Sequence, residues 1–255
     1  EGDKYYINTV EVVQNEEVIE KEKLLELINV RKGERFNIER IRKDANRIKE
    51  AIGDLGYAFV TVNPKIDKNE EDKTVMVTLV VDPSKKVYVN DVFISGNTRT
   101  LDRVIRRDVL LAPGDLYSMT DMKDSKSRLR RSGFFEKVEI DEVRVSDDKI
   151  DLYVNVEEAK TGEFKFGIGY GSYGGLSGTA SVSDKNVFGS GLSATAAVDL
   201  SSKNSTYSFS LYNPRVYDSD YSLNTSIYKS ESKYYDYTEN QTGLSVTGGK
   251  FITRY

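Results

Sequence analysis

The sequence contains no cysteine and no histidine. Without cysteine the chain forms no disulfide bonds and no thiolate metal site, although an oxidising compartment is permitted. Without histidine it lacks the most common general base and the most common metal ligand of proteins. Because no carboxylates cluster in an apolar setting either, the sequence predicts no catalytic residues, no metal site and no cofactor. We therefore expect a protein that is not an enzyme.

Two longer-range signals are also missing. No stretch approaches the roughly 18 to 20 apolar residues that a transmembrane helix needs, so the chain can cross a membrane only with strands. Positive charge is not concentrated either, because 37 basic and 41 acidic side chains are spread along the chain and give a net charge of −4. Without a basic patch, we expect no binding of nucleic acid.

What the sequence does contain changes at about residue 162. Residues 1–162 carry 62 of the 78 charged side chains, whereas residues 163–255 carry 16 charged side chains and 16 of the 27 aromatic residues. A polar segment with regularly placed aromatics and no long apolar run is typical of a transmembrane β-barrel. No signal peptide precedes Glu1, so the chain is mature, truncated or cytoplasmic. Residues 241–255 read as a strand in progress, which favours truncation.

The first part begins with a predicted module of strand, helix, helix, strand, strand. The predicted strands are residues 5–14, 58–67 and 74–82, and the first predicted helix is residues 18–29. The second helix has the clearest pattern, with apolar residues at spacings of three and four: Ile38, Ile41, Ala45, Ile48, Ile52 and Leu55. Asn37 is expected to cap this helix and Gly56 to end it. Residues 74–81 are apolar on both faces, which favours a central strand.

The same order recurs about eighty residues later in the chain. The predicted strands are residues 86–95, 135–145 and 149–157. The predicted helices run from Thr100, as the cap, to Leu111 and from Thr120 to Ser132. Residues 67–78 begin like a calcium-binding loop, but Asp72 stands where glycine is needed, so a hairpin turn is expected there. The sequence thus predicts two α+β modules in tandem.

The chain changes character at Glu163–Gly175. Two sets of residues alternate there, one apolar (Phe164, Phe166, Ile168 and Tyr170) and one of lysine and glycines (Lys165, Gly167, Gly169 and Gly171). Neighbouring side chains of a strand point to opposite faces, so one face is apolar and the other nearly bare. This suits a strand between lipid and a polar lumen, and its glycines predict loose pairing. A half-buried edge strand of a soluble sheet is the alternative.

Further strands are predicted after this one. Gly169, Gly171 and Gly174 match the spacing of a dinucleotide-binding fingerprint, but that fingerprint must open a helix and residues 176–183 alternate as a strand. Apolar and polar residues also alternate in residues 192–201, 207–211 and 223–227, and each segment is about long enough to cross a bilayer at a tilt. Six tyrosines near turns are expected to lie at the membrane interface: Tyr217, Tyr221, Tyr228, Tyr234, Tyr235 and Tyr237. A soluble β-sandwich with a tyrosine-rich surface is the alternative.

Five segments carry a resemblance to a known family. Val92–Thr100 and Gly133–Val138 resemble segments of the periplasmic POTRA repeats of the BamA family, and the glycine-rich strand, Asp184–Gly191 and Asn213–Arg215 resemble the opening of that family's outer-membrane barrel. The motifs are short, and their order along nearly the whole chain carries the resemblance. It implies POTRA domains at residues 1–83 and 84–160, followed at residues 161–255 by roughly the first six strands of a 16-stranded antiparallel transmembrane barrel.

The resemblance implies a factor that folds and inserts other outer-membrane proteins without a nucleotide. Its barrel would lie in the bacterial outer membrane and its repeats in the periplasm. The implied partners are unfolded outer-membrane protein precursors, the lipid bilayer and periplasmic assembly lipoproteins. A first strand that pairs weakly can separate from its partner at the barrel seam and expose its edge as a template for an incoming strand. The candidate seam is Phe164–Gly171. A two-partner secretion pore, which also carries two POTRA repeats, is the alternative, and a passive porin would leave the repeats unexplained.

The resemblance also places the second strand of each repeat at a sheet edge, where an unfolded client can add a strand. The candidate client-binding residues are Phe59, Val60, Thr61, Val62, Lys137, Val138, Glu139 and Ile140. The alternative is that both strands are solvated edges, protected from association by Lys65 and Lys137.

Overall fold

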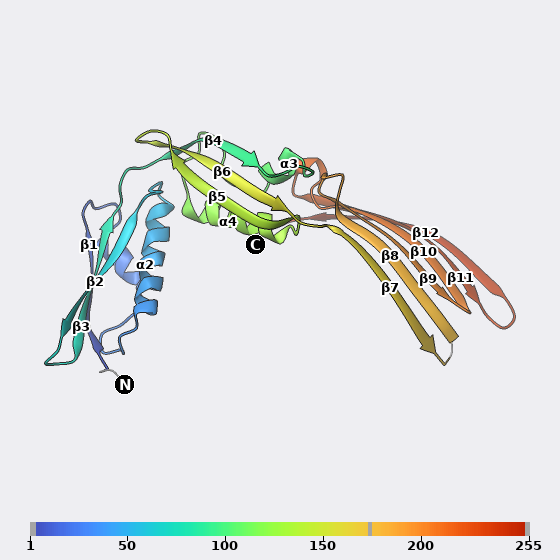
Figure 1. Ribbon diagram of the computed structural model, residues 1–255, viewed down its shortest axis with the longest axis horizontal. Helices are drawn as coiled ribbons and strands as arrows, with labels where there is room; N and C mark the ends of the chain where they lie inside the picture. Colours follow the sequence, from blue (N-terminus) through green and yellow to red (C-terminus); the bar gives the residue numbers. More distant parts are fainter. Residues whose placement is uncertain (1–3, 173–174, 253–255) are drawn as a thin grey trace. The chain divides into compact units, whose positions relative to one another are not determined.

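The computed structural model describes residues 4–172 and 175–252 (Figure 1). It divides into two compact units, one made of residues 1–93, 110–126 and 140–154 and the other of residues 94–109, 127–139 and 155–255. The first repeat lies in the first unit, the six strands that follow the repeats lie in the second, and the second repeat contributes residues to both. The predicted fold class is confirmed: two α+β modules precede a six-stranded antiparallel sheet, an open part of a barrel.

The first repeat has the predicted order of elements. These are β1 (Tyr6–Gln14), α1 (Lys21–Glu26), α2 (Ile38–Gly53), β2 (Thr61–Asn69) and β3 (Thr74–Asp82). The sheet order is β1-β3-β2, with β3 parallel to β1 and antiparallel to β2, so β3 is central as predicted. Figure 1 shows α2 lying along this small sheet. The predicted hairpin turn between β2 and β3 is also present, and Asn69 accepts hydrogen bonds there from the backbone N–H groups of Glu71 and Asp72.

Helix α2 forms where the apolar stripe predicts it. Four residues of the stripe are buried in the core of the repeat: Ile41, Ala45, Ile48 and Ile52. The Asn37 cap is confirmed, because its side-chain oxygen accepts from the backbone N–H of Glu39 at 2.9 Å. The helix ends at Gly53, before the predicted end at Gly56, and Leu55 therefore lies outside it and is exposed.

Two other helices are shorter than predicted. α1 spans six residues instead of residues 18–29. It begins later than predicted because the Gln14 side chain holds the preceding turn by donating to the Ile19 carbonyl and accepting from the Val18 N–H. In the second repeat, α3 spans Asp102–Arg106 instead of residues 100–111 and its N-cap is Leu101. The predicted Thr100 cap is wrong, since the Thr100 hydroxyl accepts a hydrogen bond from the Asn186 side chain at 2.8 Å.

The second repeat repeats the order of the first. Its remaining elements are β4 (Tyr88–Ser95), α4 (Met119–Arg131), β5 (Phe135–Arg144) and β6 (Lys149–Glu158). The sheet order is β4-β6-β5, so β6 is central. The second strand of each repeat, β2 or β5, therefore lies at a sheet edge, as expected.

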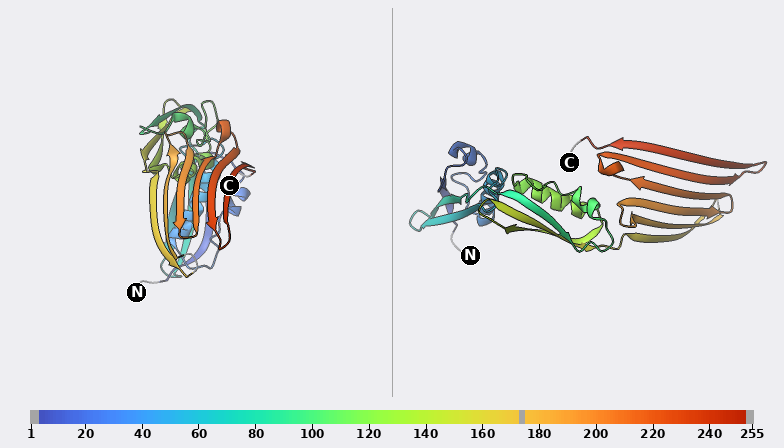
Figure 2. Two further views of the ribbon diagram at one scale, coloured as in Figure 1. Left: turned by 90° about the vertical axis from the view of Figure 1, so that its right-hand side faces the viewer. Right: turned by 90° about the horizontal axis from the view of Figure 1, so that it is seen from above.

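The last part of the chain is one antiparallel sheet. Its strands are β7 (Gly162–Gly171), β8 (Gly175–Val187), β9 (Leu192–Ser201), β10 (Asn204–Asn213), β11 (Tyr221–Lys233) and β12 (Thr238–Lys250). Figure 2 shows these strands side by side in chain order. We call the end of the sheet where β7 begins the proximal end, and the end where β7 finishes the distal end. The strand expected through residues 241–255 ends at Lys250, and Thr253–Tyr255 lie outside the described residues.

Candidate functional site

One face of the six-stranded sheet is apolar from strand to strand. On β7, the side chains of Phe164, Phe166, Ile168 and Tyr170 are 68–82% exposed. The strand register extends this face across the sheet in a row of directly opposed residues: Phe164, Val182, Ala196, Phe209, Ile227 and Leu244. A solvent-exposed apolar row of this length suits contact with lipid, and it does not suit the surface of a soluble sandwich.

The opposite face is polar or bare. A row on that face again crosses every strand, and no member of it is a large apolar residue: Gly167, Thr179, Asp199, Thr206, Ser230 and Gln241. Tyr228 also lies on this face, in the middle of β11 opposite Ser208. The expectation that Tyr228 is an interface aromatic is therefore wrong. Its ring lies over Gly243, where an added Cβ would come within 2.4 Å of a ring carbon.

Strand β7 is an edge of this sheet. It pairs with β8 only, and no second partner occurs among the described residues. The pairing runs without a register shift from Gly162, opposite Asp184, to Gly171, opposite Gly175. The predicted seam residues Phe164–Gly171 thus all lie on β7, one of the two edge strands of the described sheet, and β12 is the other. Loose pairing does not appear as a break in the register and stays a prediction.

The same strand excludes the dinucleotide site. Gly169 and Gly171 lie inside β7, and residues 176–183 lie inside β8, so no helix begins at this point of the described chain. Gly174 lies outside the described residues. The spacing of Gly169 and Gly171 therefore comes from the alternation of a strand.

Two of the predicted client-binding residues do not lie on a strand. Phe59 and Val60 precede β2, which begins at Thr61. Val60 is only 1% exposed and belongs to the core of the first repeat, because the chain turns there and its N–H donates to the Tyr57 carbonyl at 3.3 Å. The prediction that Phe59 and Val60 lie on the edge strand is therefore wrong. The predicted strand begins at residue 58, because the apolar residues before Thr61 resemble strand residues. Thr61 and Val62 lie on edge strand β2.

The other four predicted residues lie on edge strand β5. Val138 and Ile140 point into the core and are buried, whereas Lys137 and Glu139 are exposed and form an ion pair of 3.1 Å. Only the backbone edge and the outward side chains are therefore open to a partner. The role of this edge in binding clients stays a prediction.

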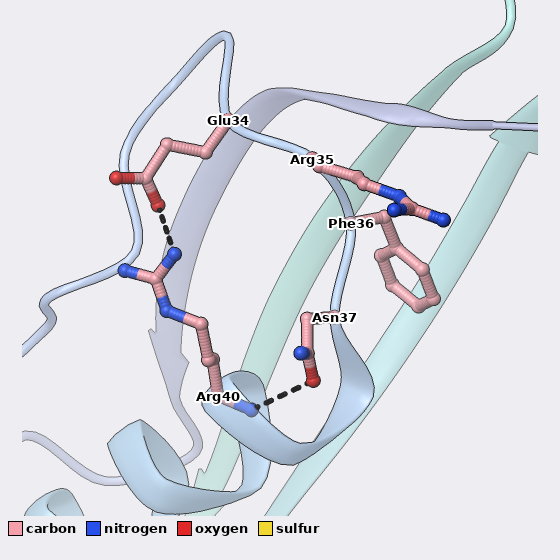
Figure 3. A pocket seen from close by; sticks show the side chains of 5 residues that line it. All are labelled: Glu34, Arg35, Phe36, Asn37 and Arg40. Carbon is pink, nitrogen blue, oxygen red and sulfur yellow. Dashed lines mark hydrogen bonds and ion pairs between the residues drawn. The ribbon is translucent and has the colours of Figure 1, made fainter.

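Two pockets in the described part of the repeats contain no set of groups that identifies a ligand. One of about 560 Å³ lies beside the start of α2 (Figure 3). Its lining residues serve the fold, because Glu34 pairs with Arg40 at 2.9 Å and Asn37 caps the helix. A second, of about 300 Å³, adjoins Tyr117, whose hydroxyl donates to Glu142 and whose pKa is raised by burial.

The described residues offer no group of three or more Asp or Glu side chains arranged to hold a metal ion. Over residues 4–172 and 175–252, no helix combines the length and the apolar character that a membrane span requires.

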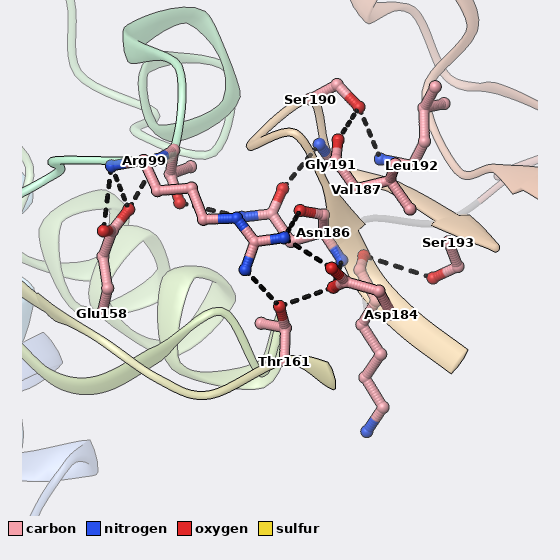
Figure 4. Close-up of polar contacts among 12 residues, drawn as sticks. Arg99, Glu158, Thr161, Asp184, Asn186, Val187, Ser190, Gly191, Leu192 and Ser193 are labelled. Atoms are coloured by element: carbon pink, nitrogen blue, oxygen red, sulfur yellow. Dashed lines mark hydrogen bonds and ion pairs between the residues drawn. The ribbon is translucent and has the colours of Figure 1, made fainter. Parts of the chain in front are cut away.

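A polar network that no sequence pattern predicts ties the second repeat to the proximal end of the sheet (Figure 4). Its centre is the Arg99 guanidinium group. It donates to the Thr161 hydroxyl at 3.3 Å, to the Asp184 carboxylate at 2.5 Å and to the Asn186 carbonyl at 3.0 Å. Arg99 and Asp184 are 85 residues apart in the chain, and no spacing or periodicity connects them.

Glu158, at the end of β6, holds the backbone that carries Arg99. Its carboxylate accepts from the Arg99 N–H at 2.9 Å, from the Thr100 N–H at 2.5 Å and from the Thr98 hydroxyl at 2.7 Å. Burial by itself would raise the pKa of Glu158, but these hydrogen bonds favour the ionised carboxylate and hold the pKa below its usual range.

The turn between β8 and β9 fits closely against the same loop. Asn186 is buried, and its side chain donates to the Thr100 hydroxyl and accepts from the Gly191 N–H. The Leu101 N–H donates to the Gly189 carbonyl at 2.9 Å. Gly189 has a φ of +70°, and a Cβ there would lie 1.9 Å from the Arg99 carbonyl oxygen. Only glycine fits this contact.

Comparisons with known proteins agree with these features. The family model "Surface antigen variable number repeat" (POTRA) matches residues 5–84 and 87–159, and the "Omp85 superfamily domain" matches residues 186–255. The crystal structure of BamA from Haemophilus ducreyi lacking POTRA domains 1–3 superposes with a TM-score of 0.81 and 27% identity. The match covers 96% of this chain and 47% of that one.

Two curated relatives are both outer membrane protein assembly factor BamA. The protein of Nitratidesulfovibrio vulgaris is 30% identical over 253 residues, which are 96% of this chain and 32% of the relative. The protein of Neorickettsia risticii is 33% identical over 258 residues, which are 100% of this chain and 34% of the relative. The chain thus spans about a third of the length of these relatives. The family is not one of enzymes. With POTRA repeats over more than half of its length and an Omp85 domain after them, the chain belongs to the BamA/Omp85 family of outer-membrane proteins, whose repeats lie in the periplasm.

Proposed function

We propose that this chain acts in the assembly of outer-membrane proteins. Its repeats receive unfolded β-barrel precursors in the periplasm, and its sheet folds and inserts them into the outer membrane by lending the edge of β7 as a template. The supporting observation is that β7, with glycine at three alternate positions of its polar face, is an edge strand of the described sheet, whose other face is continuously apolar. Backbone groups in hydrocarbon must be paired, so a strand can enter the membrane only beside another strand.

The template edge combines two properties. Its unpaired N–H and C=O groups can form a ladder with an incoming strand. Its polar face carries glycine at positions 167, 169 and 171, so no side chain there resists rearrangement of the strand. An incoming strand can thus complete its hydrogen bonds before it meets lipid.

The repeats supply the other half of the proposal. Residues 1–83 and 84–160 act as POTRA domains, residues 161–255 as barrel strands, and the edges of β2 and β5 bind precursors by strand addition. The partners are unfolded outer-membrane protein precursors, periplasmic assembly lipoproteins and the lipid bilayer.

A photo-crosslinking amino acid at Gly169 of the full-length protein in cells tests the proposal. We expect adducts with newly exported barrel precursors that map to a terminal strand of the client. The matched control is the same amino acid at Ser208, which lies on the same face of the sheet, in the interior strand β10. This position should give no client adducts, because both edges of β10 are occupied.

Two results would count against the proposal. Adducts at Gly169 with a secreted soluble protein alone would favour a two-partner secretion pore, which moves its substrate through the lumen. The absence of adducts at Gly169, with the protein correctly folded, would mean that this edge stays closed and is no template.

A further inference from the structure

We infer that Arg99 is a positioning residue that keeps β7 paired with β8 when the other edge of β7 opens. This inference rests on the proposed function, because it states which side of the template strand yields. The Arg99 network, defined as Arg99, Glu158, Thr161, Asp184 and Asn186, carries it.

The β7–β8 hairpin has one closed and one open end. At the distal end Gly171 faces Gly175, which is close to it in the chain, whereas at the proximal end Gly162 and Asp184 face each other without a covalent link. A hairpin frays from its open end, and the loose pairing predicted from the glycines of β7 would add to this fraying. Without a further constraint, β7 would separate from β8 at the proximal end as readily as from any partner on its other edge.

The Arg99 network lies at this open end. The guanidinium group contacts Thr161, directly before β7, and Asp184 and Asn186 near the end of β8. The Thr161 hydroxyl also donates to Asp184 at 2.6 Å, and the Lys185 N–H donates to the Thr161 carbonyl at 3.2 Å. One side chain from the repeat thus joins the two strands where no turn joins them.

The backbone that carries Arg99 is also held in place. The loop at residues 97–101 belongs to no helix or strand, so its backbone has no ladder to fix it. Glu158 replaces the ladder by accepting two backbone N–H groups of this loop, those of Arg99 and Thr100. The planar guanidinium group then meets its three acceptors in one orientation.

A second contact holds the next turn. Arg103 and Arg107 lie 3.4 Å and 3.0 Å from the Asp218 carboxylate, in the turn between β10 and β11. The proximal ends of β8, β9, β10 and β11 are therefore attached to one short segment of the repeat. At the distal end of β7, by contrast, Gly171 has no atom within 4 Å of its would-be Cβ.

Hydrogen exchange of the full-length protein in lipid nanodiscs tests the inference without any client. Glu158→Gln and Arg99→Gln should raise the exchange rates of the proximal amides of β7 and β8 about tenfold or more, because they remove charge-assisted hydrogen bonds. Each has a matched control that removes the same charge from an exposed residue outside the network: Glu157→Gln for Glu158→Gln, and Lys160→Gln for Arg99→Gln. The controls should leave these amides unchanged.

The outcomes separate this inference from the proposed function. Rates within about twofold of the unsubstituted protein in both network variants would overturn the inference. Faster exchange in the network variants, together with fewer client adducts at Gly169 than in the unsubstituted protein, supports the inference. Faster exchange with an undiminished yield of client adducts overturns the positioning role of Arg99. If the unsubstituted protein gives no adducts at Gly169, the proposed function fails, and the exchange rates still decide whether the network holds β7 to β8.

Discussion

The carboxylate of Asp54, directly after α2 in the first repeat, accepts hydrogen bonds from the backbone N–H and the hydroxyl of Thr120 in the second repeat, both at 2.7 Å. Thr120 lies in the first turn of α4, where backbone N–H groups have no partner within the helix. Ser118 satisfies the next of these groups, on Asp121. One repeat thus caps a helix of the other.

Replacing Asp54 with alanine should uncap α4 from outside its own repeat. We expect a loss of about 1 kcal/mol, the usual cost of removing a cap, and so about fivefold faster hydrogen exchange at the amides of Thr120 and Asp121. Glu50→Gln is the control, because it removes an exposed ion pair with Lys123 that should contribute little. Equal effects of both variants would show that Asp54 acts only as a surface charge.

Stiffening β7 should impair the template without unfolding the protein. Gly169→Ala combined with Gly171→Ala should stabilise pairing by roughly 0.5–1 kcal/mol per residue, because alanine loses less backbone freedom. The sites accept a Cβ, since the Ser177 hydroxyl at 3.1 Å is the only close atom at Gly169 and none is close at Gly171. We expect slower precursor insertion in reconstituted membranes. Gly178→Ala, on interior strand β8 with open space, is the control, and equal slowing there would contradict the prediction.

The turn between β8 and β9 should reject any side chain at Gly189. Gly189→Ala adds both backbone strain and a clash with the Arg99 carbonyl, whereas Gly114→Ala adds strain alone, because nothing lies within 4 Å of that site. We expect Gly189→Ala to unfold at a lower denaturant concentration than Gly114→Ala. The difference between the two midpoints measures the cost of the clash. Equal midpoints would mean that the turn moves away at no cost.

The edge of β5 should contact unfolded precursors. A photo-crosslinking residue at Glu139, exposed on this edge strand, should give adducts with precursors in cells. The control position is Tyr153 on the central strand β6, whose two edges are paired. Adducts of equal yield at both positions would indicate nonspecific binding of precursors to the repeat instead of strand addition.

The stabilising effect of Glu158 should disappear in acid. Its folded-state pKa lies below the ordinary 4.5, so the unfolded state binds the proton more readily. The contribution is therefore complete above about pH 4.5 and is lost as the pH falls through the lower folded-state pKa. Denaturant unfolding should show a difference between the unsubstituted protein and Glu158→Gln that is constant near neutral pH and shrinks below this window. A difference that grows in acid would contradict the assignment, and Glu157→Gln should show little difference at any pH.

Most elements of the fold could be predicted because their signals are local. The apolar stripe from Ile41 to Ile52 places α2, the alternation at Phe164–Gly171 places β7, and the recurrence of one element order reveals the two repeats. Boundaries were harder, because Val60 looks like a strand residue but is held in the core by a turn, and Thr100 looks like a cap but contacts Asn186.

The sequence by itself determined where most strands lie and which face of each strand is apolar, because alternation is a property of neighbours along the chain. Only the tertiary structure decided the register between the strands, how the apolar faces align from Phe164 to Leu244, and that Arg99 meets Asp184. Register and contacts between distant segments depend on pairing and on packed turns such as that of Gly189. These interactions leave no period in the sequence, because the partners are brought together only when the sheet and the repeat have folded.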